Sequence, residues 1–173
     1  EHGLETSVST KAIGIGLAAI LGLLLFAGGL LYNKYRIAPV LAITDLEALD
    51  AKGAPTRVWS QNGRGAVVVF YASWCHDCAR EMPKLAQALR GHLRGVDAIA
   101  LTDEDITAMV RYQYRTAHPF RFYALPADFG AYGIHAIPTT YIVNANGETI
   151  YAKVGDVDWT SPEIASAVKQ AGL

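Results

Sequence analysis

Hydrophobic residues fall into two regions of different pattern along this chain. From residue 12 to residue 32 there is no charged residue, and a membrane-crossing helix needs about 20 apolar residues. A buried helix of a soluble domain is rarely apolar on every face. The apolar part of a cleaved signal peptide is shorter, about 7–15 residues. The pattern therefore predicts one transmembrane helix over residues 12–33, after an N-terminal tail of residues 1–11.

Beyond a linker at residues 34–42, where Pro39 disfavours continued helix, the pattern alternates between strand-like and helix-like segments. The apolar, β-branched and aromatic run at 66–72 is typical of a strand that is buried on both faces. The predicted strands are 66–72, 96–101, 120–125, 139–143 and 149–154, and the predicted helices are 75–93, 102–114 and one that begins near 161. This order predicts an α/β domain over residues 43–173, with a mixed sheet flanked by helices.

Local signals mark where some of these elements begin or turn. Thr102 is expected to cap the second of these helices, because acidic residues follow it in the first turn. Asn146-Gly147 lies where the last two strands should form a hairpin turn. Ser161 and Pro162 are typical of a helix cap and of the first helical position.

Charge and cysteine content exclude several functions. The formal net charge is −1, from 15 basic and 16 acidic residues. These charges form no basic stripe, so a nucleic acid is not an expected partner. A disulfide-stapled secreted domain has more cysteines, more widely spaced, than the two at Cys75 and Cys78. A four-thiolate zinc site within this chain would need four cysteines. The pair is therefore predicted to carry chemistry.

The segment Trp74-Cys75-His76-Asp77-Cys78 lies between the buried strand and the first helix of the domain. A thiol at a helix N-terminus faces unpaired backbone N–H groups and the positive end of the helix dipole, which favour its reactive thiolate. The second sulfur follows after about one turn and can resolve a mixed disulfide. We expect Cys75 to be the exposed attacking residue and Cys78 the more buried resolving one, with no cofactor.

Two blocks of this sequence resemble the thioredoxin superfamily, and specifically its TlpA/ResA branch of membrane-anchored bacterial proteins. The first runs from Phe70 to Cys78 and continues through Glu81 and Pro83. The second is Tyr132-Gly133-Ile134-His135-Ala136-Ile137-Pro138-Thr139-Thr140-Tyr141-Ile142-Val143, followed by Asn146-Gly147. With a similar segment that begins at Ala38-Pro39, the resemblance covers about residues 38–170. It implies a thioredoxin-like fold and thiol–disulfide oxidoreductase activity.

The resemblance also implies roles for individual residues. Pro138 is expected to be cis and to pack against the cysteine pair, which frees the backbone of Ile137 to pair with a substrate strand beside Trp74. Pro83 is expected to kink the helix. Glu81 matches the family's glutamate, whereas Val69 occupies the place of the buried acid of thioredoxins proper.

Glu81 has two possible readings, a carboxyl group that tunes the thiols and assists proton transfer to or from Cys78, or a solvated helix charge. Inside the motif, a protonated His76 would favour a thiolate and Asp77 would oppose it. The reduction potential and the direction of electron flow therefore stay open.

Two other functions fit parts of the sequence. Cys75 and Cys78 with His76 or His135 could bind copper, since thiolate and imidazole suit that metal. Alternatively, the chain could be a structural subunit of a membrane complex, docked through the small residues Gly14, Ala18 and Gly22 of its apolar helix. A peroxiredoxin fits least well, because both sulfurs belong to the dithiol motif. His92 and His118 are expected to be surface residues.

The charges that flank the apolar helix and the family resemblance predict opposite orientations of the chain in the membrane. Lys11 precedes the helix, and Lys34 and Arg36 follow it, so the positive-inside rule would place the domain in the cytoplasm. The resemblance and the tether favour the other side. We expect a single-pass protein of the bacterial inner membrane with a periplasmic domain. Its expected partners are protein thiols and disulfides, such as those of apocytochrome c or of copper sites, together with the lipid bilayer and other transmembrane helices.

Overall fold

A computed structural model describes residues 10–59 and 64–173, apart from the side chains of 10–12 and 33–36. The expected tail lies largely outside this part, as do the side chains of Lys11, Lys34 and Arg36. The chain divides into two compact units, 1–35 and 36–173, which are described separately.

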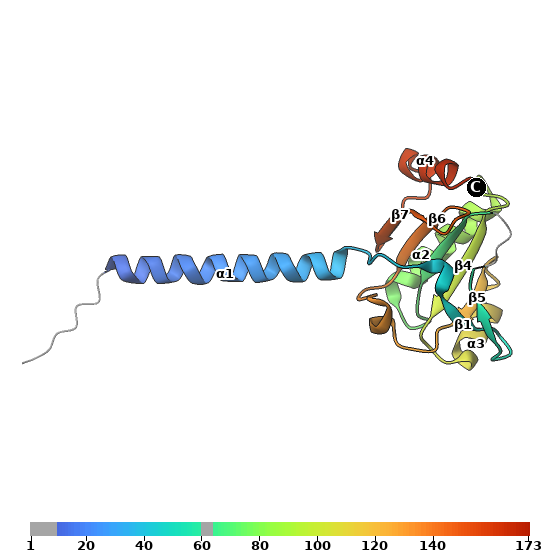
Figure 1. Ribbon diagram of the computed structural model, residues 1–173, viewed down its shortest axis with the longest axis horizontal. Helices are drawn as coiled ribbons and strands as arrows, with labels where there is room; N and C mark the ends of the chain where they lie inside the picture. Colours follow the sequence, from blue (N-terminus) through green and yellow to red (C-terminus); the bar gives the residue numbers. More distant parts are fainter. Residues whose placement is uncertain (1–9, 60–63) are drawn as a thin grey trace, which may run out of the picture. The chain divides into compact units, whose positions relative to one another are not determined.

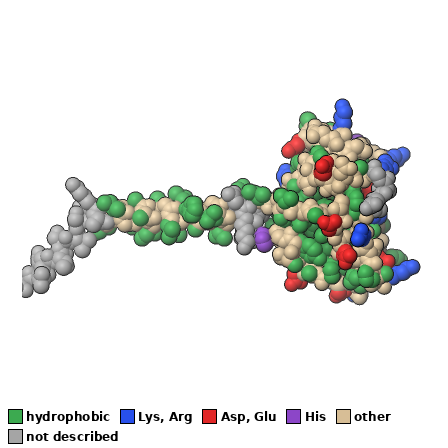
Figure 2. All heavy atoms as spheres, in the orientation of Figure 1, with side chains coloured by type: hydrophobic (Ala, Val, Ile, Leu, Met, Phe, Trp, Pro, Cys, Tyr) green, Lys and Arg blue, Asp and Glu red, His purple; other side chains and the backbone are tan. Residues whose placement is uncertain are grey.

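The first unit contains helix α1, Thr10–Arg36, of 27 residues. At 1.5 Å per residue it is about 40 Å long. Its segment Ile13–Tyr32 has a mean hydropathy of 2.4, and none of it is buried. Figure 2 shows hydrophobic side chains along the helix on the face in view. Length and composition therefore fit a membrane span, and the absence of burial disagrees with the core helix of a soluble domain. The helix ends three residues later than predicted.

In the described part of the second unit, seven strands form one mixed sheet in the order β2-β1-β5-β4-β3-β6-β7 (Figure 1). The strands are β1 Glu47–Leu49, β2 Pro55–Arg57, β3 Ala66–Phe70, β4 Asp97–Thr102, β5 Arg121–Ala124, β6 Thr139–Val143 and β7 Thr149–Val154. The helices are α2 His76–Arg90, α3 Ile106–Thr116 and α4 Pro162–Gln170, with 3-10 turns η1 Ile43–Asp45 and η2 Phe129–Tyr132. The predicted α/β thioredoxin-like architecture is confirmed.

Strand β3 lies inside the sheet, between β4 and β6, and leads to the cysteine motif. It pairs with β4 in parallel and with β6 in antiparallel orientation, so Val68 lies between Ile99 and Tyr141. All five of its residues are buried. Alternate side chains of β3 pack on one face against α2, α3 and α4, and on the other against η1, η2 and Trp59. This double coverage explains the continuous apolar run in the sequence.

The structure corrects the predicted start of α3, the helix that was predicted over residues 102–114. Thr102 is not a cap: it is the buried last residue of β4, paired with Ala124 of β5. The cap of α3 is Asp105, whose Oδ1 accepts a hydrogen bond from the backbone amide of Ala108 at 2.8 Å. Threonine and aspartate both suit an N-cap. Here Thr102 is still part of β4 and pairs with β5, so the cap falls on Asp105.

The predicted N-cap of α4 and the predicted hairpin turn between β6 and β7 are confirmed. The Ser161 hydroxyl accepts from the amide of Ile164 at the start of α4. In the β6–β7 hairpin, Asn144 Oδ1 accepts from the amides of Asn146 and Glu148, each at 3.0 Å. Gly147 has φ +80°, which favours glycine. The three-residue strands β1 and β2 were not predicted.

Candidate active site

Cys75 occupies the N-cap of α2, directly after the buried strand β3 and a short turn. Its Sγ accepts a hydrogen bond from the backbone N–H of Cys78 at 3.2 Å. Of the two residues, Cys75 is 8% exposed and Cys78 is 1% exposed. The predicted order of exposure is confirmed, but Cys75 is recessed rather than open. The neighbouring Trp74 is 74% exposed.

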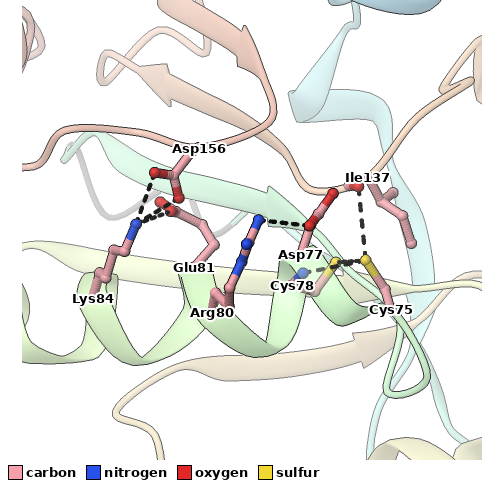
Figure 3. Close-up of polar contacts among 8 residues, drawn as sticks. All are labelled: Cys75, Asp77, Cys78, Arg80, Glu81, Lys84, Ile137 and Asp156. Carbon is pink, nitrogen blue, oxygen red and sulfur yellow. Dashed lines mark hydrogen bonds and ion pairs between the residues drawn. The ribbon is translucent and has the colours of Figure 1, made fainter.

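Both thiols are free, and their sulfur atoms lie 2.6 Å apart (Figure 3). The Cys78 thiol donates to the sulfur of Cys75. Burial, and then this hydrogen bond, raise the pKa of Cys78 well above its usual range, because a low-dielectric site disfavours the thiolate. Cys78 therefore keeps its proton near neutral pH. The sulfur of Cys75 accepts hydrogen bonds from both the amide and the thiol of Cys78.

The Ile137–Pro138 peptide bond is cis, as the resemblance implied. It lies beside the dithiol, since the carbonyl oxygen of Ile137 is 3.7 Å from Cys75 Sγ and accepts from its thiol (Figure 3). Pro138 is buried and Ile137 is half-buried. The carbonyl of Pro138 accepts from the amide of Gly155 at 2.7 Å, which ties this segment to the end of β7. Cys75, Cys78, Ile137 and Pro138 are thus brought together.

Glu81 is buried, with 1% of its surface exposed, so its reading as a solvated helix charge is wrong. Its Oε1 accepts from the indole N–H of Trp159 at 2.7 Å. Its Oε2 has no hydrogen-bond partner among the described residues and lies 3.8 Å from Lys84 Nζ. In Figure 3 the carboxyl group points toward Lys84 and Asp156, away from the two sulfur atoms.

The electrostatics of Glu81 follow from this placement. Burial, and then the adjacent Asp156 carboxyl group, raise its pKa to about 7, whereas the Trp159 indole and the backbone amide of Val157 lower it. A carboxyl group with such a pKa can gain or lose a proton near neutral pH. The sequence pattern gave no sign of Trp159, Lys84 or Asp156 as its partners.

The two residues between the cysteines are both exposed. Asp77 pairs with Arg80 at 2.7 Å, and each side chain is 62% exposed, so this ion pair contributes little to stability. His76 also faces solvent. Helix α2 runs through Pro83 without interruption, and the predicted kink stays a prediction.

The turn before Cys75 is held by a residue that sequence reasoning missed. Glu104 accepts from the backbone N–H of Ser73 at 2.5 Å and from its hydroxyl at 2.6 Å. The hydroxyl of Thr102 donates to the same carboxylate at 3.2 Å. Next to it, Asp103 Oδ2 accepts from the amide of Phe129, in the segment that leads to Pro138. Two acids after β4 therefore brace both sides of the dithiol.

The described residues do not bring together a set of ligands for copper. His135 is exposed, and no three His, Cys, Asp or Glu side chains in the described ranges lie together as a metal site. His92 is exposed, as expected, and its Nε2 lies 2.9 Å from the carbonyl of Trp159. His118 is half-buried, and its ring packs against Tyr112 and Phe120. Burial lowers the pKa of His118.

Comparison with known proteins identifies this arrangement. The model of the Redoxin family matches residues 38–170. The chain belongs to the Redoxin family. The thiol–disulfide oxidoreductase ResA of Bacillus thuringiensis is 28% identical over 123 residues, which are 69% of this chain and 68% of that protein. ResA of Geobacillus kaustophilus is 26% identical over 145 residues, covering 82% and 83% of the two chains.

Solved structures share the fold of this chain. A thio-disulfide isomerase from Thermus thermophilus superposes with a TM-score of 0.59 at 25% identity, over 79% of this chain and 98% of that one. A Mycobacterium tuberculosis structure, dsbF in mixed oxidised and reduced forms, shares the fold with a TM-score of 0.57 at 23% identity, over 77% and 99%. Family, fold and dithiol together make this Redoxin-family chain a thiol–disulfide oxidoreductase that acts on protein thiols or disulfides.

Proposed function

We propose that this protein is a membrane-tethered oxidoreductase that exchanges an electron pair with partner proteins through Cys75 and Cys78, in the reducing direction. One observation carries the assignment of roles. The Cys75 sulfur caps α2 and accepts from the Cys78 amide and thiol, while it faces the Ile137 carbonyl. The more exposed of the two cysteines is therefore also the one at the N-terminus of α2, where the attacking thiol of such a motif is expected.

The proposed reaction has two steps. The Cys75 thiolate attacks one sulfur of a partner disulfide, so that a Cys75–partner bond forms and the other partner sulfur leaves as a thiolate. Cys78 then loses its proton and attacks the Cys75 sulfur. The Cys75–Cys78 disulfide forms, the second partner sulfur leaves with its electron pair, and both partner thiolates take protons from solvent. The partner gains two electrons and this chain loses them.

The edge at Ile137–Pro138 is the proposed binding site for the partner. An extended segment can pair with an unpaired backbone edge through main-chain hydrogen bonds. The Ile137 carbonyl points to Cys75, and the exposed side chain of the preceding residue, Trp74, offers an apolar surface to a partner. A partner strand on this edge would bring its disulfide to Cys75.

Glu81 is the proposed general base for Cys78. A buried thiol with a raised pKa needs a proton acceptor before it can attack. Glu81 lies three residues after Cys78 on the same helix, both are 1% exposed, and its pKa of about 7 makes it an acceptor from neutral pH upward. Because its carboxyl group points away from the sulfurs in this structure, the transfer requires a rotation of the side chain.

We place the protein in a bacterial inner membrane with the domain on the periplasmic side. The ResA relatives and the apolar helix support an anchored protein, and disulfide partners are expected outside the cytoplasm. The proposed partners are cysteines of apocytochrome c or of copper sites at the membrane. The lipid bilayer surrounds α1, whose Gly14, Ala18 and Gly22 form a face that another transmembrane helix could contact.

A trapping experiment tests the proposal. Cys78→Ala leaves Cys75 able to attack but removes the resolving thiol, so mixed disulfides with natural partners should accumulate in membranes and be identified by mass spectrometry. The double variant Cys75→Ala with Cys78→Ala is the matched control and should retain none. If Cys78→Ala traps no more protein than this control, the proposed mechanism is wrong.

A further inference from the structure

An ion pair covers the solvent side of Glu81, and the exchange steps above do not use it. Lys84 Nζ lies 2.6 Å and 2.8 Å from the two carboxylate oxygens of Asp156, and 3.8 Å from Glu81 Oε2. Lys84 is on α2 and Asp156 follows β7, so two separate elements meet over the carboxyl group (Figure 3). The side chains of Lys84 and Asp156 are 48% and 63% exposed, against 1% for Glu81.

A cavity opens beside this ion pair. Its volume is about 520 Å³, and its lining includes Lys84, Asp156, Trp159 and His92 but neither cysteine. Trp159 donates to Glu81 from the same wall. The two charges next to the buried carboxyl group, and the indole that donates to it, therefore border a cavity that the dithiol does not line.

Few other charges face Glu81 among the described residues. Tyr151 on β7 is the nearby titratable group whose own pKa Glu81 helps to raise. Arg80 on α2 contacts Asp77. The remaining polar groups at the carboxyl are the neutral donors of Trp159 and Val157. Lys84 and Asp156 are thus the two full charges closest to it.

We propose that Lys84 and Asp156 are positioning residues that form a charge clamp on Glu81, setting its protonation equilibrium and directing its proton exchange into the adjacent cavity. The clamp deepens the proposed function and rests on it where Glu81 serves Cys78. The proton that Cys78 gives up during its attack on Cys75 passes to the Glu81 carboxylate. It then leaves through Oε2 to solvent beside Asp156, while the electron pair leaves with the partner sulfur.

The two charges of the clamp act with opposite sign. The Asp156 carboxylate repels an ionised Glu81, whereas the Lys84 ammonium attracts it. Removing the charge of Asp156 also leaves Lys84 to pair with Glu81 alone, which adds to the effect. Asp156→Asn should therefore lower the pKa of Glu81, and Lys84→Met should raise it. A role in packing alone would not produce opposite shifts.

The test measures Glu81 directly and then the reaction. In the full-length reduced protein in detergent micelles, the Glu81 carboxyl carbon is titrated by NMR. Asp156→Asn should move the midpoint down by about one pH unit and Lys84→Met up by about one. Asp128→Asn is the matched control: it removes the same charge from an exposed carboxylate that does not line this cavity, and should leave the midpoint in place.

The pH profile of the resolving step is the second measurement. A thiol peptide is attached to Cys75 as a mixed disulfide, and its release by Cys78 is followed at several pH values. The midpoint of release should shift as the Glu81 titration does. If the midpoint of the Glu81 titration is unchanged in both variants, the proposed clamp is wrong. If those midpoints shift in opposite directions but Glu81→Gln leaves the release profile unchanged, the clamp holds and the general-base role fails.

Discussion

At the scale of single residues, the site separates two thiols by burial. Cys75 and Cys78 have the same chemistry, but the first accepts two hydrogen bonds at a helix N-terminus and the second is enclosed by the core. Burial raises the pKa of Cys78 and also that of Glu81. Reactivity is therefore concentrated in Cys75, and the second thiol acts after it has lost a proton.

Glu81 should make stability depend on pH. Its pKa is about 7 in the folded protein against an ordinary 4.5, so between these values the folded chain binds a proton more tightly than the unfolded chain. This contribution is fully present below pH 4.5 and is lost as the pH rises through 7. Glu81→Gln keeps an acceptor for Trp159 and removes the charge. It should be more stable than the natural protein at pH 8 by about 3 kcal/mol, with little difference at pH 4.5.

Chemical denaturation of the full chain in micelles, followed by tryptophan fluorescence at pH 4.5 and pH 8, measures this difference. Glu163→Gln on the exposed face of α4 removes a charge outside the core and should leave the pH dependence unchanged. An identical pH dependence in Glu81→Gln and the natural protein would show that Glu81 does not hold its proton more tightly on folding.

At the scale of elements, the loop after β4 connects the sheet to the dithiol. Its three consecutive acids have different tasks: Asp103 bonds the backbone before Pro138, Glu104 bonds Ser73, and Asp105 caps α3. The acids after this strand therefore hold the turn before Cys75 and the start of η2, the 3-10 turn that precedes the Ile137–Pro138 segment.

Glu104→Ala should loosen the turn that carries Cys75. The alanine removes both carboxylate oxygens, so the Ser73 amide and hydroxyl lose their acceptors. We expect a loss of about 1–3 kcal/mol in the free energy of unfolding and a roughly tenfold slower attack on a disulfide peptide, measured by stopped-flow. Asp105→Ala, which removes the α3 cap, should cost about 1 kcal/mol and leave that rate unchanged. Equal rates in both variants would contradict the role of Glu104.

What the sequence could predict at this scale depended on the length and burial of each element. The buried strands β3, β4 and β6 are continuous apolar runs, and their positions were predicted. Strands β1 and β2 have three residues each at one edge of the sheet, too few to show a period. The motif identified Cys75 and Cys78, and the resemblance identified Pro138.

The surroundings of the dithiol could not be predicted from local pattern. Trp159 meets Glu81 across 78 positions and Asp156 meets Lys84 across 72, so no spacing rule joins them. Glu104 reaches Ser73 across 31 positions. Glu104 lies between Asp103 and Asp105, and all three acids are equally compatible with the first turn of a helix, so the sequence does not single it out. Such contacts depend on which loops the sheet order brings together.

At the scale of the whole molecule, the chain joins an apolar helix to a polar-surfaced domain, and the side of the membrane on which the domain lies decides its partners. Fusing alkaline phosphatase to the C-terminus should give an active enzyme in a bacterial host, because that reporter needs disulfides formed outside the cytoplasm. A green fluorescent protein fusion in the same place is the control and should stay dark after export. If the green fluorescent protein fusion is fluorescent and the phosphatase fusion is inactive, the domain lies in the cytoplasm. That is the orientation that Lys34 and Arg36 predict by the positive-inside rule.

The recess around Cys75 has a consequence for which proteins can react. Because only 8% of Cys75 is exposed, it should react poorly with a disulfide that lies flush with a folded surface. A disulfide must protrude on a loose, stretched segment to reach it. The enzyme should therefore act on chains that are still being matured and ignore finished ones, so that the shape of the site itself protects the structural disulfides of its neighbours.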